Sequence, residues 1–332
     1  MTVVAPGKLM IAGEYSVLAG GEALALAVEP GVEATATASD TWELGRAESE
    51  VTWREGQAVP EDLRFAHAAI EAVRGGLSPC RVVTRTLGGV ATGGRKPGAG
   101  GSASATVAVV GALLASAGLP MSEESVLHPA LAAHLAAQGG RGSGYDIATI
   151  VYGGLVRWRP ARLAGPGGAY EAERLPWPEG LHVLAGYTGR SASTSRFLAE
   201  LDRLAATDRA RVSGELARLG QPVTRLIEAF AAADLSAVLT GVRACHAALV
   251  AWDSARNLGI VSAEVAEVIA HAEACGAASK VSGAGGGDSV LAFARDSRTL
   301  DAVATEWRAR GYEPLPFRIS LHGVREKIPE PA

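Results

Sequence analysis

Short apolar runs that alternate with polar positions and end at glycine or proline predict β-strands in both halves of the chain. The turn signal Pro6-Gly7 separates the first two runs and predicts two short strands there. A later run, at 151–158, predicts a strand that Gly153 and Gly154 interrupt. The expected strands span residues 2–5, 9–12, 31–53, 80–87, 151–158, 181–187, 290–293 and 316–322.

Other segments carry apolar residues at helical spacing or as one continuous run, and both patterns predict helices. Ser262 is a suitable N-cap for a helix that stops at Gly276. The segment 194–257 is helical in character almost throughout, with a break expected at 220–222, where Gly-Gln-Pro interrupts it. The expected helices span residues 60–75, 107–114, 122–137, 194–257, 262–276 and 297–310.

Strands and helices mix in both halves without a regular β-α-β rhythm. This order favours an α+β fold in each of two lobes over a doubly wound parallel sheet. A length of 332 residues is sufficient for two domains with sizeable cores. Loops at 165–168 and 176–180 place the expected boundary between a nucleotide-binding lobe, 1–178, and a C-terminal lobe, 179–332.

Composition changes this picture little, but it argues against some partners. Apolar residues make up 48% of the chain and charged residues 20%, as in an ordinary soluble globular protein. The net charge of −4 gives no reason to expect nucleic acid or an anionic membrane as partner. Three scattered cysteines without metal-binding spacing favour a reduced, cytoplasmic compartment. Neither a signal peptide nor a bilayer-spanning apolar run is expected, and the chain is expected to be a monomer or a homodimer.

The segment KPGAGGSASAT at 96–106 carries the strongest chemical signal. Its glycines lead directly into the apolar helix expected at 107–114. Glycine lets the backbone pass close to a ligand, and a helix N-terminus adds unpaired N–H groups and a positive dipole end. These features predict an anion site, above all for nucleotide phosphates, with a glycine-rich surface turn as the alternative. The segment matches neither the Walker A loop nor the dinucleotide-binding fingerprint.

Three glycine-containing motifs are more informative together, in their order along the chain, than each is alone. They are APGKLMIAGEY at 5–15, GAGGSA at 98–103 and KVSGAGGG at 280–287. In this order they resemble the three motifs of the GHMP kinases, small-molecule kinases named after galactose, homoserine, mevalonate and phosphomevalonate. The resemblance covers nearly the whole chain, with one departure: Gly101-Ser102 stands where the family has paired serines.

The resemblance implies a two-lobed fold, with an N-terminal lobe like ribosomal protein S5 and a ferredoxin-like C-terminal lobe. It also implies an enzyme that uses ATP and Mg²⁺. By resemblance Lys8 stabilises charge on the transferred phosphoryl group, and Asp146 accepts or orients the acceptor's proton. Taken without the motifs, Lys8 reads as a surface lysine and Asp146 as a turn or N-cap residue.

The resemblance also assigns the nucleotide and metal contacts. Ser102 is implied as the Mg²⁺ ligand, with Ser104 as the alternative. Glu14 is expected either to orient a lysine or to contact Mg²⁺. The residues expected to bind the nucleotide are Lys96, Gly98, Ala99, Gly100, Gly101, Ser102 and Ser104.

Within the family, the sequence most resembles the phosphomevalonate kinases. Tyr15 stands where mevalonate kinases usually carry histidine, Asp288 follows the third cluster, and GSGYDIA at 142–148 is typical of that group. The resemblance implies ATP-dependent phosphorylation of (R)-5-phosphomevalonate to the diphosphate, in the mevalonate route to isoprenoids. A charged acceptor needs cationic contacts, which the polar run around Arg190 offers. The residues expected to bind the acceptor are Glu14, Tyr15, Ser143, Gly144, Arg190, Ser191, Gly283, Ala284, Gly285 and Gly286.

Three other functions remain open at this point. One is mevalonate kinase or another GHMP small-molecule kinase. Another is diphosphomevalonate decarboxylase, a related lyase that also consumes ATP. The third is a relative without activity that serves as a binding module, and the presence of Lys8, Ser102 and Asp146 argues against it.

Overall fold

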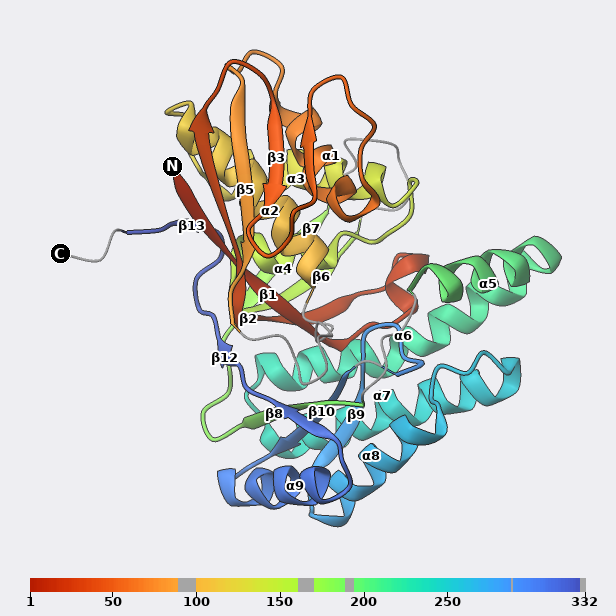
Figure 1. The fold of residues 1–332 in the computed structure, drawn as a ribbon. Coiled ribbons are helices and arrows are strands. Elements are labelled where there is room, and N and C mark those ends of the chain that lie inside the picture. The colour runs from red at the N-terminus through yellow and green to blue at the C-terminus, as the bar shows by residue number, and fades with distance from the viewer. Residues whose placement is uncertain (89–99, 161–169, 189–193, 288, 329–332) are drawn as a thin grey trace.

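The computed structural model describes residues 1–88, 100–160, 170–188, 194–287 and 289–328. Two β-sheets, each covered by helices, form the two ends of the molecule in Figure 1. Helices and strands mix in both, which confirms the α+β fold class expected from the sequence. The division at 178/179 stays a proposal.

The first sheet has nine strands within the described residues. Its main path runs β13-β1-β2-β5-β3-β4, while β6 and β12 also pair with β2, and β7 pairs with β6. The β3–β5 pair is parallel and the other pairs are antiparallel. The strands are β1 (Thr2–Ala12), β2 (Ala23–Ala38), β3 (Glu43–Arg46), β4 (Thr52–Arg54), β5 (Cys80–Thr86), β6 (Leu155–Arg159), β7 (Glu171–Leu175), β12 (Arg318–Ile319) and β13 (Arg325–Glu326).

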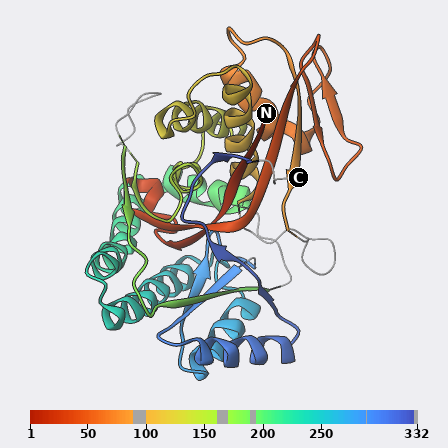
Figure 2. The same ribbon diagram turned by 90° about the vertical axis from the view of Figure 1, so that its left-hand side faces the viewer.

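Helices cover one face of this sheet, as Figure 2 shows from the side. Along β1 the side chains alternate: Met10 packs toward these helices, and Leu9 and Ile11 pack toward the other half of the molecule. The central strands are therefore apolar on both faces. The helices are α1 (Arg64–Val73), α2 (Gly101–Ser116), α3 (Glu123–Ala137) and α4 (Tyr145–Tyr152), with the 3₁₀ turns η1 (Ser16–Ala19) and η2 (Glu61–Leu63).

The second sheet is antiparallel in the order β11-β8-β10-β9. Leu291 and Phe293 of β10 pack toward α6, α7 and the first sheet, whereas Val290 and Ala292 pack toward α8 and α9. The elements are β8 (His182–Tyr187), β9 (Ala278–Ser282), β10 (Ser289–Ala294), β11 (Glu313–Leu315), α5 (Thr194–Thr207), α6 (Arg209–Ala231), α7 (Leu235–Arg256), α8 (Ala263–Ala274) and α9 (Ser297–Ala309).

The chain returns to the first sheet after completing the second. Ile319 of β12 pairs with Val28 of β2, and Glu326 of β13 pairs with Val3 of β1. The segment after the second sheet thus belongs to the first sheet by its hydrogen bonds.

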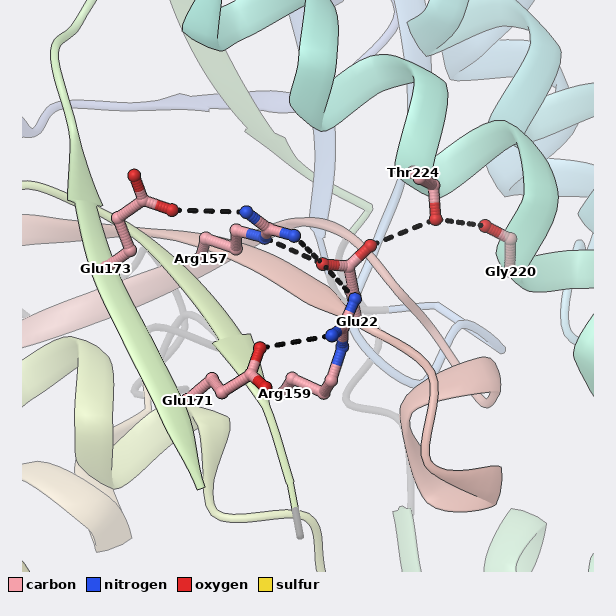
Figure 3. A network of polar contacts seen from close by, with 7 residues as sticks. All are labelled: Glu22, Arg157, Arg159, Glu171, Glu173, Gly220 and Thr224. Atoms are coloured by element: carbon pink, nitrogen blue, oxygen red, sulfur yellow. Dashed lines mark hydrogen bonds and ion pairs between the residues drawn. The ribbon is translucent and has the colours of Figure 1, made fainter. Parts of the chain in front are cut away.

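A polar network also joins the two halves (Figure 3). The buried Glu22 carboxylate, at the start of β2, accepts hydrogen bonds from Arg157 Nε at 2.7 Å and from Thr224 Oγ1 at 3.0 Å. Arg159 Nη2 lies 3.1 Å from the same carboxylate. Arg157 and Arg159 belong to the first sheet and Thr224 to α6, so Glu22 connects the two halves.

Three expected elements are wrong. Pro6-Gly7 does not end a strand, because β1 runs through it with a shift of register between Ala5 and Gly7. The expected break at 220–222 is absent: α6 continues through Pro222, which is buried. The strand expected over 316–322 is reduced to β12.

The start of the 151–158 strand is also wrong. Residues 145–152 form α4 although β-branched residues are frequent there, and the strand begins at Leu155. Burial of Ile147, Ile150 and Val151 among α2, α3 and the first sheet outweighs their strand propensity.

One described helix, α7, has the length and apolar composition to cross a membrane. In the structure Val238, Val242 and Cys245 of this helix are buried, and the helix packs against α6 and β9. A core helix of a globular protein can have the same length and apolar composition as a membrane-spanning helix.

Candidate active site

Motifs that are far apart in the sequence meet around β1. The Ser104 hydroxyl donates to the Pro6 carbonyl oxygen at 2.8 Å, which holds the start of α2 against β1. The Ser282 hydroxyl donates to the Met10 carbonyl oxygen at 2.9 Å, which joins β9 to the same strand. Helix α4 packs on β1 as well. One strand thus brings together all the motif segments predicted from the sequence.

The start of α2 is shaped to receive an anion. Gly100 precedes the helix with a φ of 81°, a left-handed conformation that glycine adopts without strain. A Cβ at this position would lie 2.9 Å from Lys8 Cε, so glycine also makes room for the lysine side chain. Gly101 and Ser102 form an exposed first turn, where N–H groups lack intrahelical partners. This turn is suited to hold phosphate oxygens beside Lys8.

The two serines expected to bind nucleotide have different surroundings. Ser104 is buried, and its hydroxyl makes hydrogen bonds to the carbonyl oxygens of Pro6, at 2.8 Å, and Gly100, at 3.1 Å. Ser102 is exposed in the first turn of α2. The structure therefore uses Ser104 to hold the start of α2 against β1 and leaves Ser102 accessible from solvent.

Lys8 and Asp146 both lie close to Tyr145. The Lys8 ammonium is 5.4 Å from the centroid of the Tyr145 ring, within the range of a cation–π contact. Burial raises the pKa of the Tyr145 hydroxyl, the Lys8 ammonium opposes that shift, and the Asp146 carboxylate adds to it. Both residues predicted to be catalytic thus act on the same phenol.

Asp146 is positioned by the turn that begins α4. Its Oδ1 accepts a hydrogen bond from the backbone N–H of Ile147 at 2.9 Å. Gly144 has a φ of 79°, and a Cβ there would lie 2.5 Å from Leu131 Cδ2. The Ser143 carbonyl oxygen accepts a hydrogen bond from Trp158 Nε1 at 2.8 Å. Backbone contacts therefore fix the segment that contains three of the predicted site residues.

Glu14 forms a buried ion pair with Lys280 of β9. Both side chains are almost fully buried, with 5% and 1% of their surfaces exposed. Burial raises the pKa of the Glu14 carboxyl, and the Lys280 ammonium opposes this shift. Of the two roles expected for Glu14, the structure shows contact with a lysine. Lys280 itself was missed, although a lysine inside a strand of small and apolar residues signals a buried partner.

Tyr15 supports the third glycine cluster. Its hydroxyl donates to the Ala284 carbonyl oxygen, and its ring contacts Trp252 at a centroid distance of 5.3 Å. The Tyr15 side chain is buried. The cluster itself is anchored again where the Gly286 N–H donates to the Ile260 carbonyl oxygen at 2.6 Å. Contact of Tyr15 and of residues 283–286 with an acceptor stays a prediction.

Some predicted site residues lie outside the described residues. They are Lys96, Gly98, Ala99, Arg190 and Ser191.

Two family models match the chain. The model described as "GHMP kinases N terminal domain" matches residues 89–154, and the model described as "GHMP kinases C terminal" matches residues 226–313. The first match includes α2 and the turn of Asp146, and the second includes β9 and the third glycine cluster.

Individual relatives cover the full length of the chain. A phosphomevalonate kinase from a Streptomyces species is 30% identical and covers 96% of this chain and 97% of its own. A mevalonate kinase from Thermococcus gammatolerans is 28% identical and covers 98% of each chain. Among solved structures, a Streptococcus pneumoniae phosphomevalonate kinase in complex with phosphomevalonate and AMPPNP superposes with a TM-score of 0.82. It is 22% identical and covers 96% of this chain and 99% of that one.

Proposed function

This chain belongs to the GHMP kinase family, and we propose that it transfers the terminal phosphoryl group of ATP to (R)-5-phosphomevalonate. The observation that carries the proposal is the convergence of Lys8, the N-terminus of α2 and Asp146 around Tyr145. The Streptomyces relative supports phosphomevalonate as the acceptor. The likeness to solved GHMP kinases confirms the expected fold.

ATP and Mg²⁺ fit the residues at the start of α2. The exposed first turn offers backbone N–H groups to phosphate oxygens, and Lys8 lies directly against Gly100. No group of three or more His, Cys, Asp or Glu residues in the described part of the chain is placed to hold a metal ion. Mg²⁺ usually binds through one or two protein oxygens together with substrate phosphates and water, and Ser102 would supply such an oxygen. The ion would neutralise charge on the phosphates.

Phosphoryl transfer at this site requires positioning and charge stabilisation more than covalent chemistry. An oxygen of the acceptor's phosphate forms the new P–O bond while the bond to ADP breaks. Lys8 stabilises charge on the transferred group. Asp146 orients the acceptor oxygen and takes up its proton where one is present; a phosphate with a second pKa of about 6 is already largely ionised near neutral pH.

The acceptor's own phosphate requires separate cationic contacts, for which we propose Arg190 and Ser191. We also propose that residues 283–286 approach the acceptor from the second sheet, that the two lobes divide at 178/179, and that the enzyme acts in the cytoplasm as a monomer or homodimer.

An acceptor panel tests the proposal. ADP release is measured with mevalonate, phosphomevalonate and diphosphomevalonate, and CO₂ release is followed in parallel. Phosphomevalonate is expected to give the highest kcat/KM without CO₂. Preference for mevalonate would make the chain a mevalonate kinase, CO₂ release would make it a decarboxylase, and no turnover would leave a binding module.

The variant Asp146→Asn tests the site itself. It keeps the shape of the side chain and removes its charge, so kcat should fall by about 10²–10⁴-fold while ATP binding is retained. Asp301→Asn, at an exposed position of α9, is the matched control and should leave kcat unchanged. A loss of less than tenfold in Asp146→Asn would contradict the assigned role.

A further inference from the structure

His134 of α3 lies directly behind the predicted catalytic carboxylate. Its Nδ1 is 3.8 Å from Asp146 Oδ2, and only 3% of the residue is exposed. The imidazole packs on the Phe65 ring of α1, with the ring centroids 5.0 Å apart. In the described part of the chain, its Nε2 is buried and has no hydrogen-bond partner.

If the role of His134 were packing alone, a histidine would be less stable at this position than an apolar side chain of similar size. A buried polar nitrogen without a partner costs about 1–3 kcal/mol, and leucine would fill a similar volume without that cost. The arrangement also selects the tautomer. A proton on Nδ1 points toward the negative carboxylate, whereas a proton on Nε2 would leave a buried donor unpaired and turn the Nδ1 lone pair toward Asp146.

Asp146 then has a partner near each oxygen, a hydrogen bond at Oδ1 and a longer electrostatic contact at Oδ2. Its Oδ1 accepts from the Ile147 N–H at 2.9 Å, and its Oδ2 faces His134 Nδ1. Each carboxylate oxygen has two lone pairs, so both oxygens keep capacity for an acceptor. The backbone contact restrains Oδ1, and the attraction between an Nδ1–H group and Oδ2 favours the same orientation of the carboxylate.

We propose that His134 is a positioning residue that fixes the Asp146 carboxylate for phosphoryl transfer. The proposal rests on the function proposed above. The proposed role of His134 is limited to orienting the Asp146 side chain, and His134 itself does not touch the substrate. A small displacement of the Asp146 carboxylate from the acceptor oxygen should lower kcat strongly. Substrate binding should be kept, because it uses other residues.

Two variants separate positioning from packing. His134→Leu keeps volume and removes the Nδ1–H donor, so kcat should fall about 10- to 100-fold with both KM values within twofold of wild type. Its stability should equal or exceed that of wild type, since the unpaired Nε2 is also removed. His134→Asn places an amide N–H where Nδ1–H stood and leaves a cavity, so it should be less stable than His134→Leu yet several-fold more active.

The opposite order of activities would overturn the proposal, because a packing role makes activity follow stability. Equal activity of both variants and wild type would overturn it as well. His128→Leu, an exposed position on the same helix, is the control and should leave kcat unchanged.

A double-variant cycle tests whether His134 acts through Asp146. In an Asp146→Asn background, His134→Leu should cause no further loss of kcat, because the carboxylate that it orients is gone. An additive loss would place His134 in an independent role and overturn the proposal. All variants are assayed with the acceptor that the wild type prefers, so a different acceptor would refute the proposed function and leave the test of His134 intact.

Discussion

Glu14 and Glu22 are two buried carboxylates on either side of the turn between β1 and β2, and each links the first sheet to the second half of the molecule. In the described part of the chain Glu14 has one cationic partner, Lys280, which is buried with it, and the carboxylate also accepts a backbone hydrogen bond at Gly283. Glu22 contacts Arg157 and Arg159, whose side chains are 33% and 42% exposed, and also Thr224. Among the described residues, the Glu14 link thus depends on one buried cation, whereas the Glu22 link has several partners close to the protein surface.

This difference predicts how substitutions in each region change stability and catalysis. Loss of one member of a fully buried pair leaves the other charge without compensation. An arginine at the surface can be rehydrated, and a carboxylate with two arginines keeps one of them. The Glu14 pair also lies beside the third glycine cluster, whereas the Glu22 network joins β6 and β7 to α6 (Figure 3). Damage to the Glu14 region should therefore affect both stability and catalysis, and damage to the Glu22 region stability alone.

The largest effect is expected from Lys280→Met. It leaves the Glu14 carboxylate buried and unpaired, so the free energy of unfolding should fall by about 3–5 kcal/mol, as measured by urea denaturation. The kcat should fall as well, because β9 leads into residues 283–286. The double variant with Glu14→Leu should recover much of the lost stability, since an apolar pair can replace a buried ion pair. A single variant as stable as wild type would refute the comparison.

A smaller effect is expected from Glu22→Gln. The amide keeps the shape and can still accept a hydrogen bond from Thr224, but it loses the charge that faces Arg157 and Arg159. Unfolding experiments should show a loss of about 2 kcal/mol, the usual value of hydrogen bonds to a charged group. The KM values for ATP and the acceptor should not change. A rise of tenfold in either KM would connect this network to the active site and remove the contrast.

Tyr15→Phe sharpens the contrast within the Glu14 region. The variant keeps the ring against Trp252 and removes the hydrogen bond to the Ala284 carbonyl oxygen. The loss of stability should be about 1 kcal/mol. Amide hydrogen exchange around residues 284–287 should become faster, while exchange in α2 stays unchanged. Unchanged exchange in that cluster would show that Tyr15 does not anchor it.

The smallest effect is expected from Arg159→Met. Arg157 remains against Glu22, and the removed guanidinium is partly exposed, so stability should change by less than about 1 kcal/mol. Urea denaturation at low and at high salt should give nearly the same free energy of unfolding for the variant and the wild type. A loss as large as that of Lys280→Met would show that the two links are equivalent.

Local signals predicted the elements that are decided locally. Ser262 caps α8 as expected, with its hydroxyl accepting a hydrogen bond from the Val265 N–H at 3.3 Å. Pro222 and the β-branched residues of α4 misled the prediction, because burial against other elements overrides local propensity at both places. The pairing of β12 and β13 with the first sheet joins residues about three hundred positions apart, and no local pattern encodes it.

The site shows the same limit. Glycine motifs identified Lys8, Gly100 and Asp146 along the sequence, and their roles stay predictions. The contacts that support them were predicted only in part. A lysine was expected beside Glu14, but it was not identified as Lys280, and the approach of His134 to Asp146 from another helix was not predicted. A sequence motif indicates residues that are expected to contact a ligand. A residue that supports them can be identified only from distances in the folded structure.

The return of the chain to the first sheet sets an order for biosynthesis. The two residues of β12 pair with the middle of β2, and the two residues of β13 extend the sheet beyond β1. Both strands leave the ribosome after every element of the second sheet. A nascent chain that has made α1 to α4 therefore still exposes unpaired backbone on β1, which carries Lys8, and on β2, which Glu22 directly precedes. The half of the protein that contains Lys8 and Asp146 is therefore the first to be translated and the last to be closed.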